Sequence, residues 1–183
     1  LIASGILSRI QSERAEYQDF AILYRTNAQS RALEEALRRR NLPYMIYSGN
    51  SFFERAEVKD MMAYFKLVVN INDDESFKRI VNKPARGIGD TSLSALTAAA
   101  SNHKTSLFKA AFSEDLEQFG LKQAAIKKIR EFCNMIGSLT LKANEMNAHD
   151  IAKKIADESG LYMFYKMDTS IEGQSRTANV EEL

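Results

Sequence analysis

The hydrophobic pattern divides the chain into two unlike parts. In the first part, two short apolar runs rich in strand-forming residues, 20–24 and 43–47, flank a polar segment, 27–37, that has helical spacing. A strand, a helix and a second strand within about 28 residues predict a βαβ unit with parallel strands. An amphipathic segment, 1–13, precedes this unit.

The second part reads as helical throughout. After Gly49 the apolar residues recur every three or four positions, and no strand signal returns after Tyr47. The predicted helices cover 58–69, 77–81, 91–100, 107–112, 121–143 and a segment from His149 or Asp150 to Gly160. The predicted fold class is therefore mainly α with a small α/β part. A partial βαβ domain is expected at residues 1–53 and an all-helical domain at residues 54–183.

The composition is that of a folded protein without a membrane partner. The 183 residues carry a formal net charge of +1, and 45% of them are hydrophobic and 27% charged. A single cysteine excludes a disulfide framework and a multi-cysteine zinc site. No apolar run approaches the ~20 residues of a membrane-spanning helix, so we expect a soluble, cytoplasmic protein. The start at Leu1 and the helix-favouring end at 180–183 predict a fragment of a longer protein.

Charge is unevenly distributed along the helical part. Residues 76–109 contain six bases and one acid, a local excess of +5. The six bases are Lys78, Arg79, Lys83, Arg86, Lys104 and Lys109. Such an excess favours an anionic partner, and nucleic acid is the first candidate.

The glycine-containing turn at residues 84–91 lies inside this basic stretch, between two predicted helices. Its backbone amides and the positive end of the following helix suit a phosphate group. Such a turn is typical of a helix-hairpin-helix motif, which binds the nucleic-acid backbone without reading bases. The alternative is a tight helix-helix turn whose glycines serve geometry alone. The residues leave both interpretations open.

Two other places are candidate DNA contacts. Arg25 and Asn27 follow the first predicted strand, at the end where open α/β sheets bind ligands. Asn27 could equally cap the following helix, with Arg25 solvated. Phe52 and Phe53, beside Arg55, could stack on the bases of a single strand or form a hydrophobic plug between the two domains.

Signals for catalysis are missing from the sequence. It contains neither a GxxxxGK[ST] phosphate loop nor a GxGxxG fingerprint, and no nucleophile-base pair stands out. The acidic run 73–75 is interpreted as a helix start capped by Asp73 or Asp74, and not as a metal site. Cys133 falls on the apolar stripe of the predicted 121–143 helix and is expected to be a buried, inert thiol.

Several segments, in order, closely resemble the superfamily 1 DNA helicases of the UvrD/PcrA/Rep group. They are residues 21–31, 33–37, 52–60, 63–64, 72–74, 84–89 and 175–183. Members of that group use two RecA-like domains to hydrolyse ATP and to step 3′ to 5′ along single-stranded DNA. The resemblance implies that residues 1–53 begin the second RecA-like domain, 2A, and that 54–183 form most of its helical insertion, 2B.

The resemblance also implies roles for particular residues. Arg25 and Asn27 would contact single-stranded DNA, the 86–89 turn would grip the duplex ahead of the fork, and Phe52 would begin the 2A–2B hinge. Ser51 departs from the Lys or Arg that the group usually has there. The full set expected to bind DNA is Arg25, Asn27, Phe52, Arg55, Lys83, Arg86, Gly87, Ile88, Gly89 and Thr91.

By the same resemblance, ATP and Mg²⁺ belong to the parent enzyme, and this chain holds no cofactor and has no activity of its own. Its expected share is sequence-independent binding of single-stranded and duplex DNA, in repair or a related pathway. The alternative is a regulatory module that binds proteins through its helical domain and has little affinity for DNA. Exposed edges of the predicted strands would also allow dimerisation.

Overall fold

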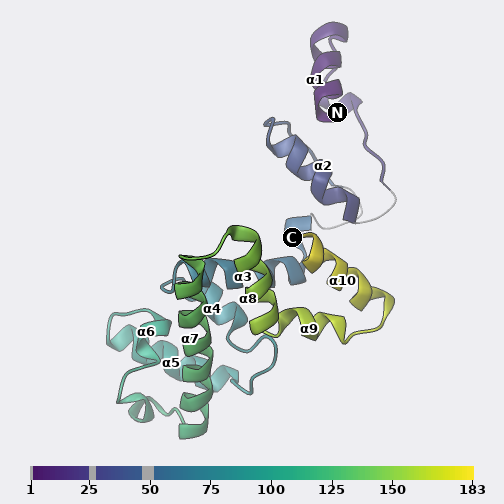
Figure 1. The fold of residues 1–183 in the computed structure, drawn as a ribbon. Helices are drawn as coiled ribbons and strands as arrows, with labels where there is room; N and C mark the ends of the chain where they lie inside the picture. The colour runs from purple at the N-terminus through teal and green to yellow at the C-terminus, as the bar shows by residue number, and fades with distance from the viewer. Residues whose placement is uncertain (1, 25–27, 47–51) are drawn as a thin grey trace.

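The computed structural model describes residues 2–24, 28–46 and 52–183, and all regular secondary structure in these ranges is helical (Figure 1). The α-helices are α1 (Ile2–Glu13), α2 (Ala28–Arg38), α3 (Ala56–Val69), α4 (Asp74–Ile80), α5 (Asp90–Asn102), α6 (Leu107–Ala110), α7 (Gln123–Ala143), α8 (Ala148–Glu158), α9 (Leu161–Lys166) and α10 (Ile171–Glu182). Three short 3₁₀ helices complete the order: η1 (Tyr17–Asp19), η2 (Phe52–Glu54) and η3 (Leu116–Phe119).

The predicted βαβ unit is wrong. The helix α2 forms, but residues 20–24 and 43–46 on either side of it are not strands. An apolar run favours an extended backbone, whereas a strand also needs a neighbour that completes its hydrogen-bond ladder. Neither run has such a neighbour in the described ranges, and Leu23 and Met45 are 95% and 74% exposed. The expected dimer through strand edges loses its basis with the strands.

Helix α3 is the centre of the helical part. It packs against α4, α7, α8 and α10, which is why its buried residues lie on more than one face. The aromatic rings of Tyr64, Phe77 and Phe132 meet there, with Phe77 and Phe132 edge to face at 5.4 Å between ring centres. One continuous apolar core extends from Met61 in α3 to Val180 in α10. Its burial is the main favourable contribution to the stability of this part.

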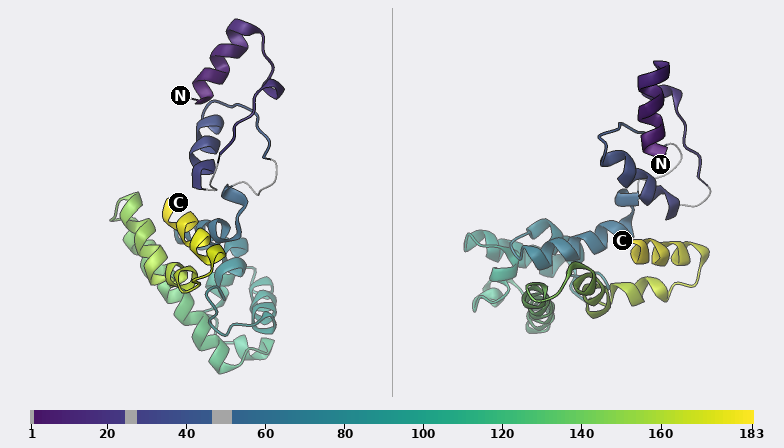
Figure 2. Two further views of the ribbon diagram at one scale, coloured as in Figure 1. Left: turned by 90° about the vertical axis from the view of Figure 1, so that its right-hand side faces the viewer. Right: turned by 45° about the horizontal axis from the view of Figure 1, so that its top comes forward.

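The N-terminal helices form a separate, smaller cluster. Ala3, Leu37 and Leu42 are its buried members. Figure 2 shows α1 and α2 projecting from the body that α3 to α10 form. Helix α2 contacts η2 and α10, and Arg31 Nη2 donates a hydrogen bond to the carbonyl of Leu183 at 3.1 Å. The domain boundary at residues 53 and 54 stays a prediction.

Polar side chains cap the starts of two helices of the second part, α4 and α8. Asp73 caps α4, as expected: its carboxylate accepts hydrogen bonds from the Ser76 backbone N–H at 3.0 Å and from Ser76 Oγ at 2.7 Å. These two bonds hold the pKa of Asp73 below its usual range. Helix α8 begins slightly earlier than predicted because the side chain of Asn147 is its cap. In the described ranges no helix is long and apolar enough to cross a membrane.

We expect Asp73→Ala to lower the free energy of unfolding by about 1 kcal/mol, the usual value of an N-cap. The matched control is Glu75→Ala, which removes an exposed carboxylate of the same helix and should change stability by less than about 0.5 kcal/mol. Urea unfolding of the three proteins measures both effects.

The pH dependence tests the same cap. Because the folded-state pKa of Asp73 is lowered, its stabilisation is present above the unfolded-state pKa and is lost as the pH falls through the folded-state value. The difference between the parent protein and Asp73→Ala should therefore shrink on acidification. A difference that stays constant from neutral to strongly acidic pH would contradict this assignment.

Candidate nucleic-acid interface

The glycine-containing turn connects α4 to α5, as the sequence predicted. Gly87 adopts a left-handed conformation with φ +71°, which is strained for residues that carry a Cβ. Gly89 is the N-cap of α5 and offers no side chain to the first-turn amides of that helix. Gly87, Gly89 and Thr91 are all exposed. The turn thus presents backbone, and the positive end of a 13-residue helix, to solvent.

Arg86 does not extend from this turn into solvent. Its Nη1 donates to the backbone carbonyls of Ile80 at 3.2 Å, Val81 at 3.4 Å and Pro84 at 3.2 Å. Its Nη2 donates to Tyr64 Oη at 2.7 Å and to the carbonyl of Ser159 at 2.9 Å. The guanidinium also lies over the Phe132 ring, 5.1 Å from its centre. Both Nη atoms are therefore engaged with the protein itself.

Tyr64 joins this arrangement from α3. Its hydroxyl donates to the carbonyl of Lys83 at 2.7 Å while it accepts from Arg86. Burial raises the pKa of Tyr64 to about 12, so the hydroxyl keeps its proton over the physiological range. The central helix α3 is thereby bonded directly to the turn.

Asn82 and Ile88 shape the turn from within. The Oδ1 of Asn82 accepts the backbone N–H groups of Arg86 at 2.8 Å and of Ile88 at 3.1 Å. The Ile88 side chain is buried in the main core, so it anchors the turn. Asn82 is not among the residues predicted from the sequence, although an Asn that begins a turn is a recognisable signal.

Lys83 and Arg79 converge on a buried carboxylate. Asp60 in α3 accepts from Arg79 Nη2 at 2.7 Å, Lys83 Nζ at 2.5 Å and Tyr165 Oη at 2.7 Å. Burial and the hydrogen bond to Asp60 raise the pKa of Tyr165. A buried charge requires such partners, and here they tie α3, α4 and α9 together. Sequence spacing alone gave no signal for this cluster.

Four of the six basic residues in segment 76–109 have partners within the protein. Lys78 pairs with Glu75, Arg79 and Lys83 pair with Asp60, and Arg86 is surrounded by carbonyls. Lys104 and Lys109 follow the far end of α5, about 18 Å along the helix from the turn. The six bases therefore do not form one free cationic patch.

The structure favours the plug interpretation of Phe52. Its side chain is fully buried, edge to face with Phe53 and under the guanidinium groups of Arg31 and Arg55. Arg55 donates to Asn179 Oδ1 at 2.7 Å and to Ser30 Oγ at 3.1 Å, which joins α2 to α10. Arg25, Asn27 and Ser51 lie outside the described residues. The DNA contacts expected of all these residues stay predictions.

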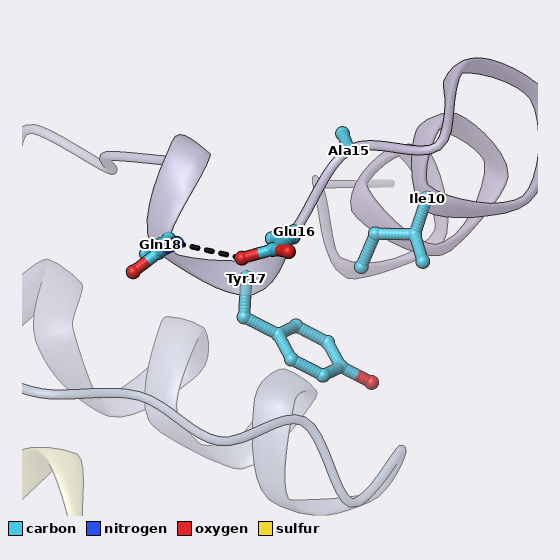
Figure 3. A pocket seen from close by; sticks show the side chains of 5 residues that line it. All are labelled: Ile10, Ala15, Glu16, Tyr17 and Gln18. Carbon is cyan, nitrogen blue, oxygen red and sulfur yellow. Dashed lines mark hydrogen bonds between the residues drawn. The ribbon is translucent and has the colours of Figure 1, made fainter.

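The cavities do not suggest chemistry. A hollow of about 480 Å³ lies beside α1 and η1, and Gln18 Nε2 donates there to Glu16 Oε2 at 2.6 Å. Figure 3 shows the side chains that line it. A larger groove of about 750 Å³ lies beside η2, α3 and α4. In its wall the guanidinium carbon of Arg38 lies 4.7 Å from the centre of the Phe53 ring. Ser76, in the wall of the larger groove, has its hydroxyl engaged in the bond to Asp73 that caps α4. The described residues contain no cluster of His, Cys, Asp and Glu that could hold a metal.

Cys133 is buried, as predicted for a core residue. Desolvation raises the pKa of its thiol to about 12. The thiol therefore stays protonated at physiological pH and is not an activated nucleophile.

Comparison with known proteins identifies relatives over nearly the whole chain. The model of the UvrD-like helicase C-terminal domain matches residues 2–180. DNA helicase II of Escherichia coli K12 is 40% identical over 184 residues, which is 99% of this chain and 25% of that protein. DNA helicase II of Salmonella typhimurium is 40% identical, over 89% of this chain and 22% of that protein. ATP-dependent DNA helicase PcrA of Staphylococcus aureus is 36% identical, over 94% and 23%. The chain thus spans about a quarter of the length of these relatives.

We expect Arg86→Ala to lower the free energy of unfolding by about 2–4 kcal/mol, because several hydrogen bonds of a charged group are lost and carbonyls are left unpaired. Arg86→Lys should restore only part of this loss, since an ammonium group cannot span acceptors on both sides of the guanidinium. Lys109→Ala is the control, because Lys109 is exposed and its side chain forms no ion pair with any residue that the structure describes. Thermal and urea unfolding measure the differences. Full stability of Arg86→Ala would contradict the structural role of this residue.

Proposed function

This chain belongs to the family of UvrD-like helicase C-terminal domains, and on that premise we propose that its turn between α4 and α5 grips the backbone of duplex DNA. The observation that carries the proposal is the exposed start of α5, where the N-cap Gly89 has no side chain to bond the first-turn amides. A Cβ at Gly89 would meet open space, so a phosphate group could approach the first-turn amides closely.

The internal bonds of the turn support this function. Asn82 holds the amides of Arg86 and Ile88 inward, and Arg86 bonds the turn to Tyr64 of α3 and to Ser159, the C-cap of α8. The exposed backbone is therefore held in one conformation before DNA arrives, and little conformational entropy is lost on binding.

Binding through this turn would be independent of base sequence. The two side chains at or next to the turn that are best suited to read base edges are Asn82 and Arg86, and both are engaged in the fold. Contacts would then fall on phosphates, which position a protein without specifying sequence and make affinity steeply salt-dependent.

The activity of the whole enzyme is also part of the proposal. We infer an ATP-dependent DNA helicase or translocase, with ATP and Mg²⁺ bound by other parts of the protein and with Arg25 and Asn27 on the single strand. Residues 54–183 would act as the DNA-gripping domain 2B, next to the hinge at Phe52. A cytoplasmic location follows from this function.

A second function is favoured by one specific observation. Met163, Phe164, Met167 and Ile171 are large apolar side chains exposed at α9 and at the start of α10. Exposed apolar residues close together are typical of protein-protein contacts. In this alternative the helical domain is a regulatory module and the chain binds little DNA.

Binding of a fluorescent duplex with a 3′ single-stranded tail, titrated with salt, distinguishes the two. The DNA-gripping function predicts micromolar binding that collapses as salt rises. Absence of binding even at low salt would contradict it and favour the regulatory module.

Asp90→Asn tests where the duplex binds. Asp90 is exposed at the first position of α5, where its negative charge opposes an incoming phosphate. Its removal should tighten binding about two- to five-fold at low salt. Glu145→Gln makes the same charge change just after the C-terminal end of α7. It should alter affinity less than about two-fold, because salt screens the interaction of an exposed charge with a distant phosphate. Equal effects of the two substitutions would show that net charge alone matters and that the turn is not the binding site.

A further inference from the structure

Lys128 of α7 lies against the glycine turn. If residue 87 carried a Cβ, that atom would stand 2.5 Å from Lys128 Nζ. The ammonium group thus occupies the space that a side chain at position 87 would need. Gly87 and Lys128 are both exposed, so the ammonium lies at the surface of the turn.

The charge of this ammonium is not neutralised within the fold. Across the described ranges no ion pair or hydrogen bond of Lys128 is found, in contrast to Lys83 and Arg86 beside it. Lys83 and Arg86, the basic residues next to and within the turn, are thus engaged in the fold. The unpaired positive charge beside the turn comes instead from Lys128 of α7. An unpaired ammonium beside exposed backbone amides is an arrangement that suits a phosphate oxygen.

We propose that Lys128 is the phosphate-binding cation of this turn. Its ammonium and the backbone amides at the start of α5 would bind phosphate oxygens of the same duplex segment, and Gly87 would leave room for the ammonium. The inference rests on the proposed function, because it assigns a further binding residue to the same DNA site.

The structure also supplies a control residue. Lys127 is the neighbouring residue of α7, is exposed and carries the same charge. Successive residues of a helix point about 100° apart, so Lys127 faces away from the direction of Lys128. Substitution of either lysine changes the net charge equally, and only one of them lies against the turn.

The test measures duplex affinity and its salt dependence for the parent protein, Lys128→Ala and Lys127→Ala, with the same tailed duplex. We expect Lys128→Ala to weaken binding about five-fold at low salt and to reduce the slope of log K against log salt by about 1. Lys127→Ala should change affinity by less than about two-fold. Lys128→Arg, which keeps the charge, should retain most of the affinity.

Unfolding measurements exclude a merely structural effect. Because Lys128 is exposed and unpaired, Lys128→Ala should unfold at the same urea concentration as the parent protein. Loss of stability together with loss of binding would overturn the inference, since Lys128 would then act by supporting the turn.

Different results would contradict the role of Lys128 and the proposed binding of duplex DNA by the turn. If the parent protein binds the duplex and Asp90→Asn tightens binding, but Lys128→Ala matches Lys127→Ala, the inference is wrong and the proposed function stands. If the parent protein does not bind duplex at low salt, both are overturned.

Discussion

The guanidinium of Arg86 is the group on which the arrangement of the helical part depends. It is a charge removed partly from water, and it is stabilised there by backbone carbonyls on three segments of the chain. Two of its acceptors, the carbonyls of Ile80 and of the C-cap Val81, belong to the C-terminal end of α4, where carbonyls lack the N–H partners of the helix interior. The Ile80 carbonyl also accepts the backbone N–H of Lys83 at 3.0 Å. A cation at that end also matches the helix dipole. Arg86 therefore ends α4 and at the same time fixes the direction in which the chain leaves it.

This constraint separates the positioning of the turn from the DNA contact that the sequence predicted for Arg86. An arginine in a glycine turn suggests a phosphate contact, but Arg86 makes its bonds inward to Tyr64 and Ser159. The groups left facing solvent are the backbone of Gly87 and Gly89 and the start of α5. Positive charge reaches them from Lys128, on another helix. In the proposed function Arg86 would position the turn, and the backbone and Lys128 would contact DNA.

The sequence predicted features that depend on residues close together in the chain, and it did not predict features that depend on residues far apart. The spacing of apolar residues predicted α3 and α7 because that pattern is local, and Asp73 was recognisable as a cap because its partner is three residues away. The strands were mispredicted since pairing depends on a distant neighbour that no local pattern reveals. The bond from Arg86 to Ser159 spans 73 residues, and the approach of Lys128 to Gly87 is likewise non-local. The position of the turn was therefore predictable. That Arg86 bonds inward, and that Lys128 lies beside the exposed backbone, was not.

Backbone amide and arginine side-chain NMR of the ¹⁵N-labelled chain, titrated with a short duplex, tests the proposed roles of Arg86 and of the turn backbone most directly. If the turn binds DNA through its backbone, the amides of Gly87, Gly89 and Thr91 should shift progressively while the Nε–H resonance of Arg86 stays in place, because its guanidinium remains bonded to the fold. A large shift of the Arg86 resonance with the turn amides unmoved would show instead that Arg86 itself grips DNA and that the proposed roles are wrong.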